Sequence, residues 1–168
     1  MKRPLVATAI AATALSIGGV VVAGTLQYRS APVGEFEVPA RDSTAEADVK
    51  LKLSPDGQEL RYDLKITEPI TDVLQAHLHH EAAGANGPIV AWLYPTDQEM
   101  PRLIAGEFDG RLARGVITVD DLRADLAGDW DGFVEALENG EIYANVHTVR
   151  FPPGEIRDQV HVHGGGHD

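Results

Sequence analysis

A strict alternation of apolar and charged residues runs through residues 45–53 and returns in residues 60–66. Because successive side chains of a strand point to opposite faces, each run predicts a β-strand with one buried face and one solvated face. The stretch Ser54-Pro55-Asp56-Gly57 lies between them and carries the residues that tight turns favour. The two runs therefore predict an antiparallel hairpin, which constrains the fold more than any other feature of the chain.

Shorter patterns predict the remaining elements. Strands are expected at residues 73–79, 89–94, 142–148 and 155–160, and one broken strand or a strand pair at 108–117. Two short helices are expected, at 119–126 after the cap Thr118 and at 130–138 before Asn139-Gly140. Many short strands with turns between them predict an all-β antiparallel sandwich or barrel, with the helices inserted before the last hairpin.

The two ends of the chain read differently from its centre. Lys2 and Arg3 precede an apolar stretch, and Val21-Val22-Ala23 offers the small residues of a cleavage site, so residues 1–24 are predicted to be a signal peptide. The alternative is an uncleaved N-terminal anchor, and both interpretations place the rest of the chain outside the cytoplasm. Residues 25–33 are expected to be a tether, and the Gly- and His-rich residues 161–168 a mobile tail.

The charge balance excludes several partners. The chain has 26 acidic and 14 basic residues, and a net charge of -12. Nucleic acids and anionic membrane surfaces attract proteins through Lys and Arg, so neither is expected as a partner, and membrane contact is expected only through an uncleaved N-terminal segment. The absence of Cys excludes disulfides, thiolate metal sites and Cys nucleophiles, so stability has to come from a packed core.

Two separated motifs each combine a strand with a polar turn. The first is Ala76-His77-Leu78-His79, followed by Asn86-Gly87-Pro88. The second is Asn145-Val146-His147-Thr148, followed by Gly154-Glu155-Ile156-Arg157. Together with the opening Gly34-Glu35-Phe36-Glu37-Val38-Pro39, they resemble the CHRD domain, the module named after chordin and found in many secreted bacterial proteins.

This resemblance covers residues 34–160 and implies an immunoglobulin-like β-barrel of the bacterial or archaeal secreted type, with residues 34–39 as its first strand. The family has no generally established chemistry, so the resemblance implies a module rather than an activity. The chain departs from the family pattern where His80 and Asp158 replace residues that are usually Gly.

The two motifs also supply candidate metal ligands. His77 and His79 lie two residues apart on one strand, so their side chains project from the same face about 7 Å apart. If the strands are neighbours, His147 adds a third imidazole, and Glu81 or Glu155 an oxygen ligand. Three imidazoles with an open position describe a zinc or copper site.

The same histidines have an alternative, structural role. Their ring nitrogens can bind loop backbone and hold the Asn86-Gly87 and Pro153-Gly154 turns without any metal. Glu155 and Arg157 alternate onto one face, where an exposed ion pair would contribute little. A second, weaker metal site is predicted at His161, His163 and His167 in the tail, for copper, zinc or nickel.

No catalytic constellation is visible. No His occurs between His80 and His147, the His-Glu-x-x-His motif is absent, and no Ser lies in a nucleophile elbow. Trp92 lies in an apolar strand and is expected in the core, whereas Trp130 is expected to be partly exposed or to anchor the helical insertion. The sequence therefore predicts an extracytoplasmic, non-catalytic module for an unknown extracellular or envelope partner; the alternative is a copper- or zinc-binding or redox protein.

Overall fold

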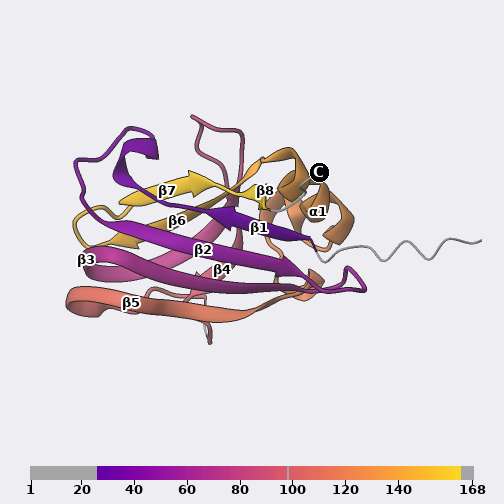
Figure 1. The fold of residues 1–168 in the computed structure, drawn as a ribbon, viewed down its shortest axis with the longest axis horizontal. Coiled ribbons are helices and arrows are strands. Elements are labelled where there is room, and N and C mark those ends of the chain that lie inside the picture. The colour runs from indigo at the N-terminus through magenta and orange to yellow at the C-terminus, as the bar shows by residue number, and fades with distance from the viewer. Residues whose placement is uncertain (1–25, 98, 164–168) are drawn as a thin grey trace, which may run out of the picture.

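The computed structural model describes residues 26–97 and 99–163. The predicted signal peptide and His167 lie outside these residues. No helix within the described part is long and apolar enough to cross a membrane. The strands are β1 Gln27–Ser30, β2 Glu46–Leu53, β3 Leu60–His80, β4 Ile89–Tyr94, β5 Ile104–Ile117, β6 Ile142–Thr148, β7 Ile156–Gln159 and β8 His161–His163 (Figure 1). The helical elements are α1 Trp130–Asn139 and the short 3-10 turns Gly34–Phe36, Val119–Asp121 and Ala124–Leu126.

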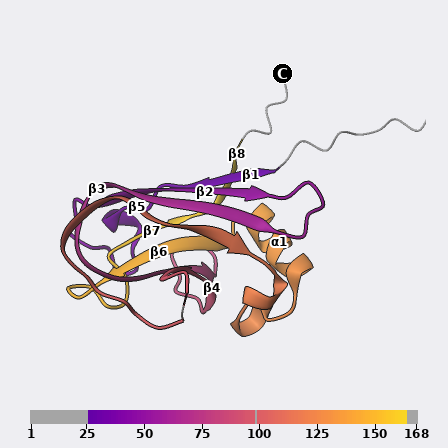
Figure 2. The same cartoon turned by 90° about the horizontal axis from the view of Figure 1, so that it is seen from below.

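All strand pairs are antiparallel and form one sheet in the order β7-β6-β3-β2-β1-β8, with β4 and β5 also paired to β3. Because only Val160 separates β7 from β8 in the chain, the two ends of this order meet and the sheet nearly closes into a barrel (Figure 1). The predicted all-β antiparallel fold is confirmed. Figure 2 shows the helical insertion gathered at one end of the barrel.

The predicted hairpin is present as β2 and β3, with Val49 opposite Leu64 and Leu51 opposite Tyr62. The apolar faces of both strands point into the barrel, where Val49 and Leu64 are fully buried. Burial of such side chains stabilises the fold by roughly 1.5–3 kcal/mol each. The alternation in the sequence therefore reflects which side chains of β2 and β3 point into the barrel interior.

Strand β3 unites two elements that the sequence predicts separately, at 60–66 and 73–79. It runs for 21 residues. Its first half pairs with β2 and β5, and its second half pairs with β6 and β4. The register with β5 shifts between Ile66 and Ile70 and again near Asp72, which has a positive φ of 54°. These irregularities bend the strand between the two parts of the barrel without ending it.

The expected tether and the expected tail each contain a short strand. Residues 27–30 form β1, which pairs with β2 and with β8, and Tyr28 is fully buried. His161–His163, expected as mobile tail, form β8 with exposed side chains. Both strands are too short for a clear alternation of apolar and polar residues. The sequence therefore does not reveal them.

Two local expectations are wrong. Residues 34–39 do not form the first strand, because Gly34–Phe36 is a 3-10 turn closed by a bond from the Glu37 amide to the Gly34 carbonyl, 3.2 Å long. Residues 119–126 form two 3-10 turns in place of one helix. Arg123 starts the second turn in extended conformation and interrupts the helical geometry.

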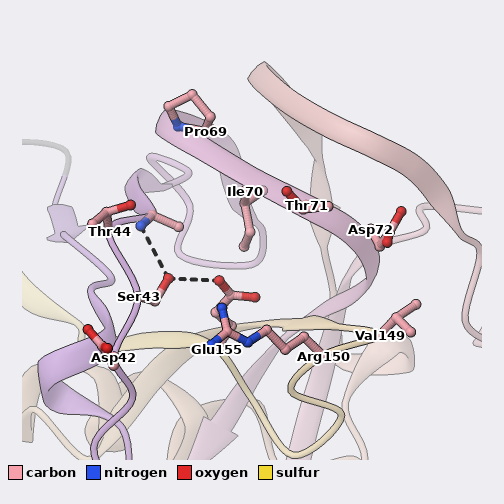
Figure 3. Close-up of a pocket in the computed structure, with 11 residues that line it drawn as sticks. Asp42, Ser43, Thr44, Pro69, Ile70, Thr71, Asp72, Val149, Arg150 and Glu155 are labelled. Carbon is pink, nitrogen blue, oxygen red and sulfur yellow. Dashed lines mark hydrogen bonds between the residues drawn. The ribbon is translucent and has the colours of Figure 1, made fainter.

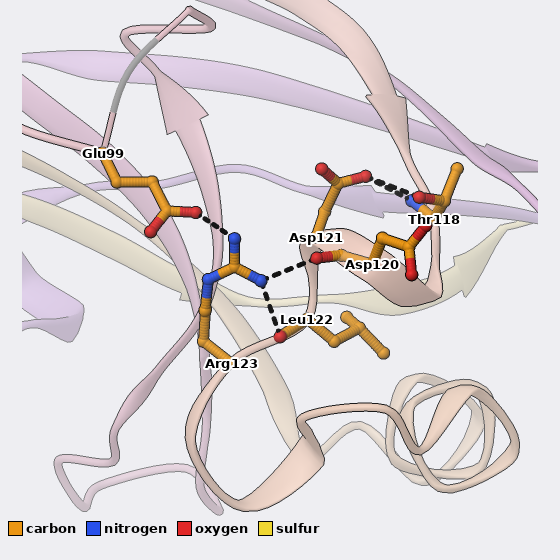
Figure 4. A network of polar contacts seen from close by, with 6 residues as sticks. All are labelled: Glu99, Thr118, Asp120, Asp121, Leu122 and Arg123. Atoms are coloured by element: carbon orange, nitrogen blue, oxygen red, sulfur yellow. Dashed lines mark hydrogen bonds and ion pairs between the residues drawn. The ribbon is translucent and has the colours of Figure 1, made fainter.

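The insertion is held at several points. The Thr118 amide and hydroxyl both donate to Asp121 Oδ2, and Arg123 donates to the carbonyls of Asp120 and Leu122 while it pairs with Glu99 (Figure 4).

The predicted second helix is α1. Trp130 anchors α1 to the β2–β3 turn through a bond from its indole nitrogen to the Gly57 carbonyl, 2.6 Å long.

Candidate metal centre

One outer face of the β3–β6–β7 part of the barrel is polar and yet buried. Cross-strand pairing places His77 opposite Asn145, His79 opposite Tyr143, and His147 opposite Gln75. Paired residues share a face, so strand β6 brings His147 onto the face that carries His77 and His79. The three imidazoles are 0–8 % exposed.

The three histidines form one compact group. Nδ1 of His77 lies 3.0 Å from Nε2 of His147. One ring nitrogen from each of His77, His79 and His147 lies within 4.8 Å of the other two. Two imidazole nitrogens bound to one zinc at 2.0–2.1 Å lie roughly 3.3 Å apart in tetrahedral geometry, so this spacing requires little movement to hold an ion.

Backbone carbonyls orient two of the rings. His79 Nδ1 lies 3.0 Å from the Gly87 carbonyl oxygen, and His147 Nδ1 lies 2.8 Å from that of Pro152. A carbonyl only accepts hydrogen bonds, so both Nδ1 atoms carry the proton and both Nε2 atoms keep a lone pair. This backbone bond from the distal nitrogen is the arrangement that fixes the tautomer of metal-binding histidines.

The tautomer of the third ring, that of His77, follows from the tautomer of His147. Since His147 Nε2 is an acceptor, His77 Nδ1 donates to it, and His77 Nε2 keeps its lone pair. The Nε2 atoms of His77 and His79 are buried and have no hydrogen-bond partner within the described residues. Two unsatisfied lone pairs in a protein interior call for an explanation, and a cation would supply one.

Burial keeps the cluster neutral. Desolvation, reinforced by His147 and His79, lowers the pKa of His77 to about 2. Desolvation also lowers the pKa of His79 to about 4, against the opposing bond to Gly87, and it lowers the pKa of His147. Because metal ions bind the unprotonated ring, all three imidazoles are in the metal-binding form at neutral pH.

Aromatic rings enclose the group. The Trp92 ring lies edge-on to His77 with centroids 4.3 Å apart, and Tyr143 stacks on His79 at 4.8 Å with the planes 5° apart. Trp92 is half-buried rather than part of the core, which corrects the sequence expectation. The Arg157 guanidinium lies 3.7 Å above the Tyr143 ring and is almost fully buried.

Arg157 differs from the exposed ion-pair partner that the sequence suggested. It donates to Asn86 Oδ1 at 2.9 Å and to the Ala85 carbonyl at 3.0 Å. None of the ion pairs among the described residues involves it. Arg157 therefore holds the loop after β3, which also supplies the carbonyl that orients His79.

Two glycines of the motifs allow this close packing. A Cβ at Gly87 would lie 1.9 Å from the His80 carbonyl oxygen. A Cβ at Gly154 would lie 2.5 Å from Glu37 Oε1 and 2.6 Å from Asn145 Nδ2, which itself donates to Glu37 Oε1 at 2.7 Å. The loops can reach the polar face only because these two positions lack a side chain.

Neither candidate oxygen ligand belongs to the group. Glu155 accepts from Ser43 Oγ at 2.7 Å and from Thr148 Oγ1 at 2.6 Å, which occupies both of its oxygens. It lines a separate pocket of about 600 Å³ between the segment before β2, the middle of β3 and the turn after β6, where Ser43 and Glu155 point toward each other (Figure 3). Glu81 is exposed and accepts from the next backbone amide, that of Ala82.

Of the tail histidines, the two that the structure describes, His161 and His163, form no part of this group. His161 and His163 are exposed on β8, and His167 lies outside the described residues.

The two departures from the family pattern carry contacts that Gly would lack. His80 Nδ1 lies 2.7 Å from Asp125 Oδ2 and ties the insertion to β3. The Ala31 amide donates to Asp158 Oδ2 at 2.8 Å and ties the segment after β1 to β7.

Alternation back from His147 through Asn145 predicts that Tyr143 shares a face with His147, and Tyr143 stacks on His79. The sequence did not predict Trp92 and Arg157 as neighbours of the histidines. The contact of Trp92 depends on how β4 pairs with β3, with His77 opposite Trp92, and no local pattern encodes that pairing.

Comparison with known proteins supports one family. The family model of the CHRD domain matches residues 29–160, which include every residue of the three-histidine group. No curated protein and no solved structure matches the chain significantly. The match begins within β1, in agreement with a folded domain that starts before residue 34. Because the model covers most of its length, the chain belongs to the CHRD domain family.

Proposed function

We propose that this protein is a non-catalytic CHRD module that binds one copper or zinc ion through His77, His79 and His147. The observation that carries the proposal is the pair of buried Nε2 lone pairs on His77 and His79 that lack a partner. Leaving a buried polar atom unsatisfied costs roughly 1–3 kcal/mol, and coordination to a metal would remove this cost.

The orientation of the rings supports binding rather than accidental clustering. The Gly87 and Pro152 carbonyls hold His79 and His147 in the tautomer that presents Nε2. The third histidine is already in contact with His147. The backbone bonds would keep the His79 and His147 rings in place when an ion binds.

The test is metal analysis of the full chain purified without an affinity tag, followed by calorimetric titration with Cu and Zn ions. We expect one ion per chain, and loss of at least tenfold in affinity in a His77→Ala, His79→Ala double variant. His80→Gln is the matched control, because His80 is the next residue and lies outside the group. Equal binding by the wild type and the double variant would refute the assignment.

A structural role for the histidines is the second candidate, and the same backbone bonds favour it. His79 and His147 connect β3 and β6 to the loops at Gly87 and Pro152 whether or not an ion is bound. If the double variant lowers the melting temperature of metal-free protein and no chain ever contains metal, the structural role alone is correct.

We further propose that the module acts outside the cytoplasm, toward an unidentified extracellular or envelope partner, and has the immunoglobulin-like barrel that the family resemblance implies. The positively charged and apolar N-terminal sequence and the acidic composition support an exported protein. Fractionation of cells that express the full chain tests the location, and N-terminal sequencing of the recovered protein distinguishes a cleaved signal from an anchor.

A further inference from the structure

We infer that the three-histidine centre selects a monovalent soft cation, Cu(I), over the divalent ions Zn(II) and Cu(II). This inference rests on the proposed function of the same site and adds the charge and type of the ion. It follows from the charge of the donors, the charge of the surroundings and the number of donors within reach.

The donors carry no charge. The group contains three imidazoles and no Asp or Glu within the described residues. The electrostatic cost of moving an ion from water into a protein interior rises with the square of its charge, and for a divalent ion it is offset chiefly by anionic ligands. A buried set of neutral donors therefore penalises Zn(II) and Cu(II) about four times as much as Cu(I) in this term.

The surroundings do not supply the missing negative charge. Arg157 stacks on Tyr143, and Tyr143 stacks on His79, so a buried cation lies behind one ligand. The hydrogen-bond partners of the Arg157 guanidinium are neutral oxygens of Asn86, Ala85 and Gln159.

One carboxyl lies near enough to balance Arg157. Glu37 is buried, and burial raises its pKa while Arg157 and Asn145 oppose the rise. Its Oε1 is turned to Asn145 Nδ2, 2.7 Å away, and not to a histidine. Glu37 and Arg157 are both buried near the centre and can carry opposite charges, so the balance between them should tune the preference for ion charge.

The number of donors also favours Cu(I) over Zn(II). Zinc in proteins takes four ligands, and a three-histidine zinc site completes its set with water. The free Nε2 atoms of His77 and His79 are closed to solvent. Cu(I) is satisfied by two or three donors, so the centre offers it a complete set without water.

The experiment is competitive titration of the full chain in which His161, His163 and His167 are replaced by Asn, so that the tail binds nothing. Cu(I) is supplied without oxygen from a chromogenic Cu(I) chelator, and Zn(II) and Cu(II) from matched chelators. We expect Cu(I) to bind on the order of 10³-fold more tightly than Cu(II) or Zn(II), because the charge penalty and the missing fourth ligand act together. Zn(II) or Cu(II) binding as tight as Cu(I) would overturn the inference and leave the proposed function intact, whereas binding of no ion would refute both.

Two substitutions that each remove one charge sharpen the test in opposite directions. Glu37→Gln keeps an oxygen for Asn145 and removes negative charge, so it should raise the ratio of Cu(I) to Zn(II) affinity about tenfold. Arg157→Gln removes positive charge and should lower the ratio by a similar factor. Glu37→Gln suffices if Arg157→Gln does not fold, and an unchanged or lowered ratio in it would contradict the electrostatic argument.

The Trp92 ring reports whether the ion occupies this centre. It lies 4.3 Å from the His77 ring, so binding should change its fluorescence. A Trp92→Phe variant should lose this change and keep Cu(I) affinity within about threefold, because Trp92 contacts a ligand and is not one. A fluorescence change that survives in Trp92→Phe would place the ion elsewhere.

Discussion

The two faces of the β3–β6–β7 sheet are buried to the same degree and have opposite chemistry. The inner face, toward the barrel interior, is apolar and consists of Ala76, Leu78, Ala144, Val146 and Ile156. The outer face consists of His77, His79, Tyr143, Asn145, His147 and Arg157, which are 0–8 % exposed. The same strands therefore bury an apolar face in the barrel core and a polar face beneath the loops on the other side.

The contrast shows that burial alone does not make a core. On the inner face each residue needs only an apolar volume of about the right size, because dispersion and hydrophobic burial are not directional. On the outer face each polar atom needs a partner at a set distance, because an unsatisfied buried group is costly. The inner face should tolerate similar-sized replacements, whereas the outer face should respond to charge, pH and metal.

The largest difference between the two faces should be the effect of acid on the unfolding free energy, which comes from the outer face. The pKa values of His77 and His79, about 2 and about 4, lie below the ordinary 6.5, so the unfolded chain binds more protons below pH 6.5. Stability is then fully present above pH 6.5 and falls as the pH drops, by about 1.4 kcal/mol per pH unit for each ring. Between pH 6.5 and pH 5 we expect metal-free protein to lose about 3 kcal/mol from these two rings, measured by urea unfolding after chelation.

The His147 pKa is also lowered, so His147 adds to this loss in the same direction. A His77→Gln, His79→Gln variant is the control and should show a much shallower pH dependence. Wild-type stability that stays constant between these pH values would mean that the rings are not held neutral by burial.

A cavity on the inner face should lower the unfolding free energy by an amount that does not depend on pH or on metal. Leu78 lies between His77 and His79 in the chain and is fully buried on the opposite face. Leu78→Ala should cost about 3 kcal/mol from lost burial and the cavity left behind. The cost is measured by urea unfolding at pH 7.5 with and without Cu and Zn ions.

The conservative variant Leu78→Met should cost less than about 1.5 kcal/mol. If Leu78→Ala abolished metal binding while the protein remained folded, the two faces would be coupled and the comparison would fail.

A single polar contact on the outer face should cost an intermediate amount. Asn145 Nδ2 donates to buried Glu37 Oε1, so Asn145→Ala leaves a buried carboxyl without this bond. We expect a loss of about 2 kcal/mol in thermal or chemical unfolding.

A double-mutant cycle with Glu37→Leu identifies the cause of this loss. In that background the carboxyl is gone, and Asn145→Ala should cost less than about 1 kcal/mol. Equal costs in both backgrounds would show that Asn145 contributes through packing and not through Glu37.

A polar contact at the surface should matter least. His80 pairs with Asp125 at 2.7 Å, with side chains that are 26 % and 50 % exposed. Asp125→Asn should change the unfolding free energy by about 0.2–1 kcal/mol, because solvent screens the pair. A loss as large as that of Asn145→Ala would break the distinction between buried and exposed polar contacts.

Local patterns predicted much of the fold. Alternation in residues 45–53 and 60–66 identified the β2–β3 hairpin, because the solvated outer face and the apolar inner face there impose a period of two. The pattern did not reveal the join between 60–66 and 73–79, because a bend at Asp72 interrupts the alternation within one strand. It did not reveal β1 and β8, which are short and depend on pairing with each other.

The candidate site was readable in part. The spacing of His77 and His79 places both on one face, because a strand repeats every two residues. Glu155 shares the second motif with His147 but turns to Ser43 and Thr148, and the structure separates the two. Arg157 looked like a surface charge, because its partners Asn86 and Ala85 lie 71 and 72 residues away in the sequence.

By itself, the sequence determined the strand character of the central hairpin, the placement of the two histidines of β3 on one face, and the need for a core without disulfides. These depend on alternation and composition, which act over a few residues. Only the tertiary structure decided that β6 lies beside β3, that loops bury the polar face, and that two Nε2 atoms are left without partners. Those features arise from antiparallel pairing between residues about 70 positions apart, and local physics does not specify which distant strand becomes the neighbour.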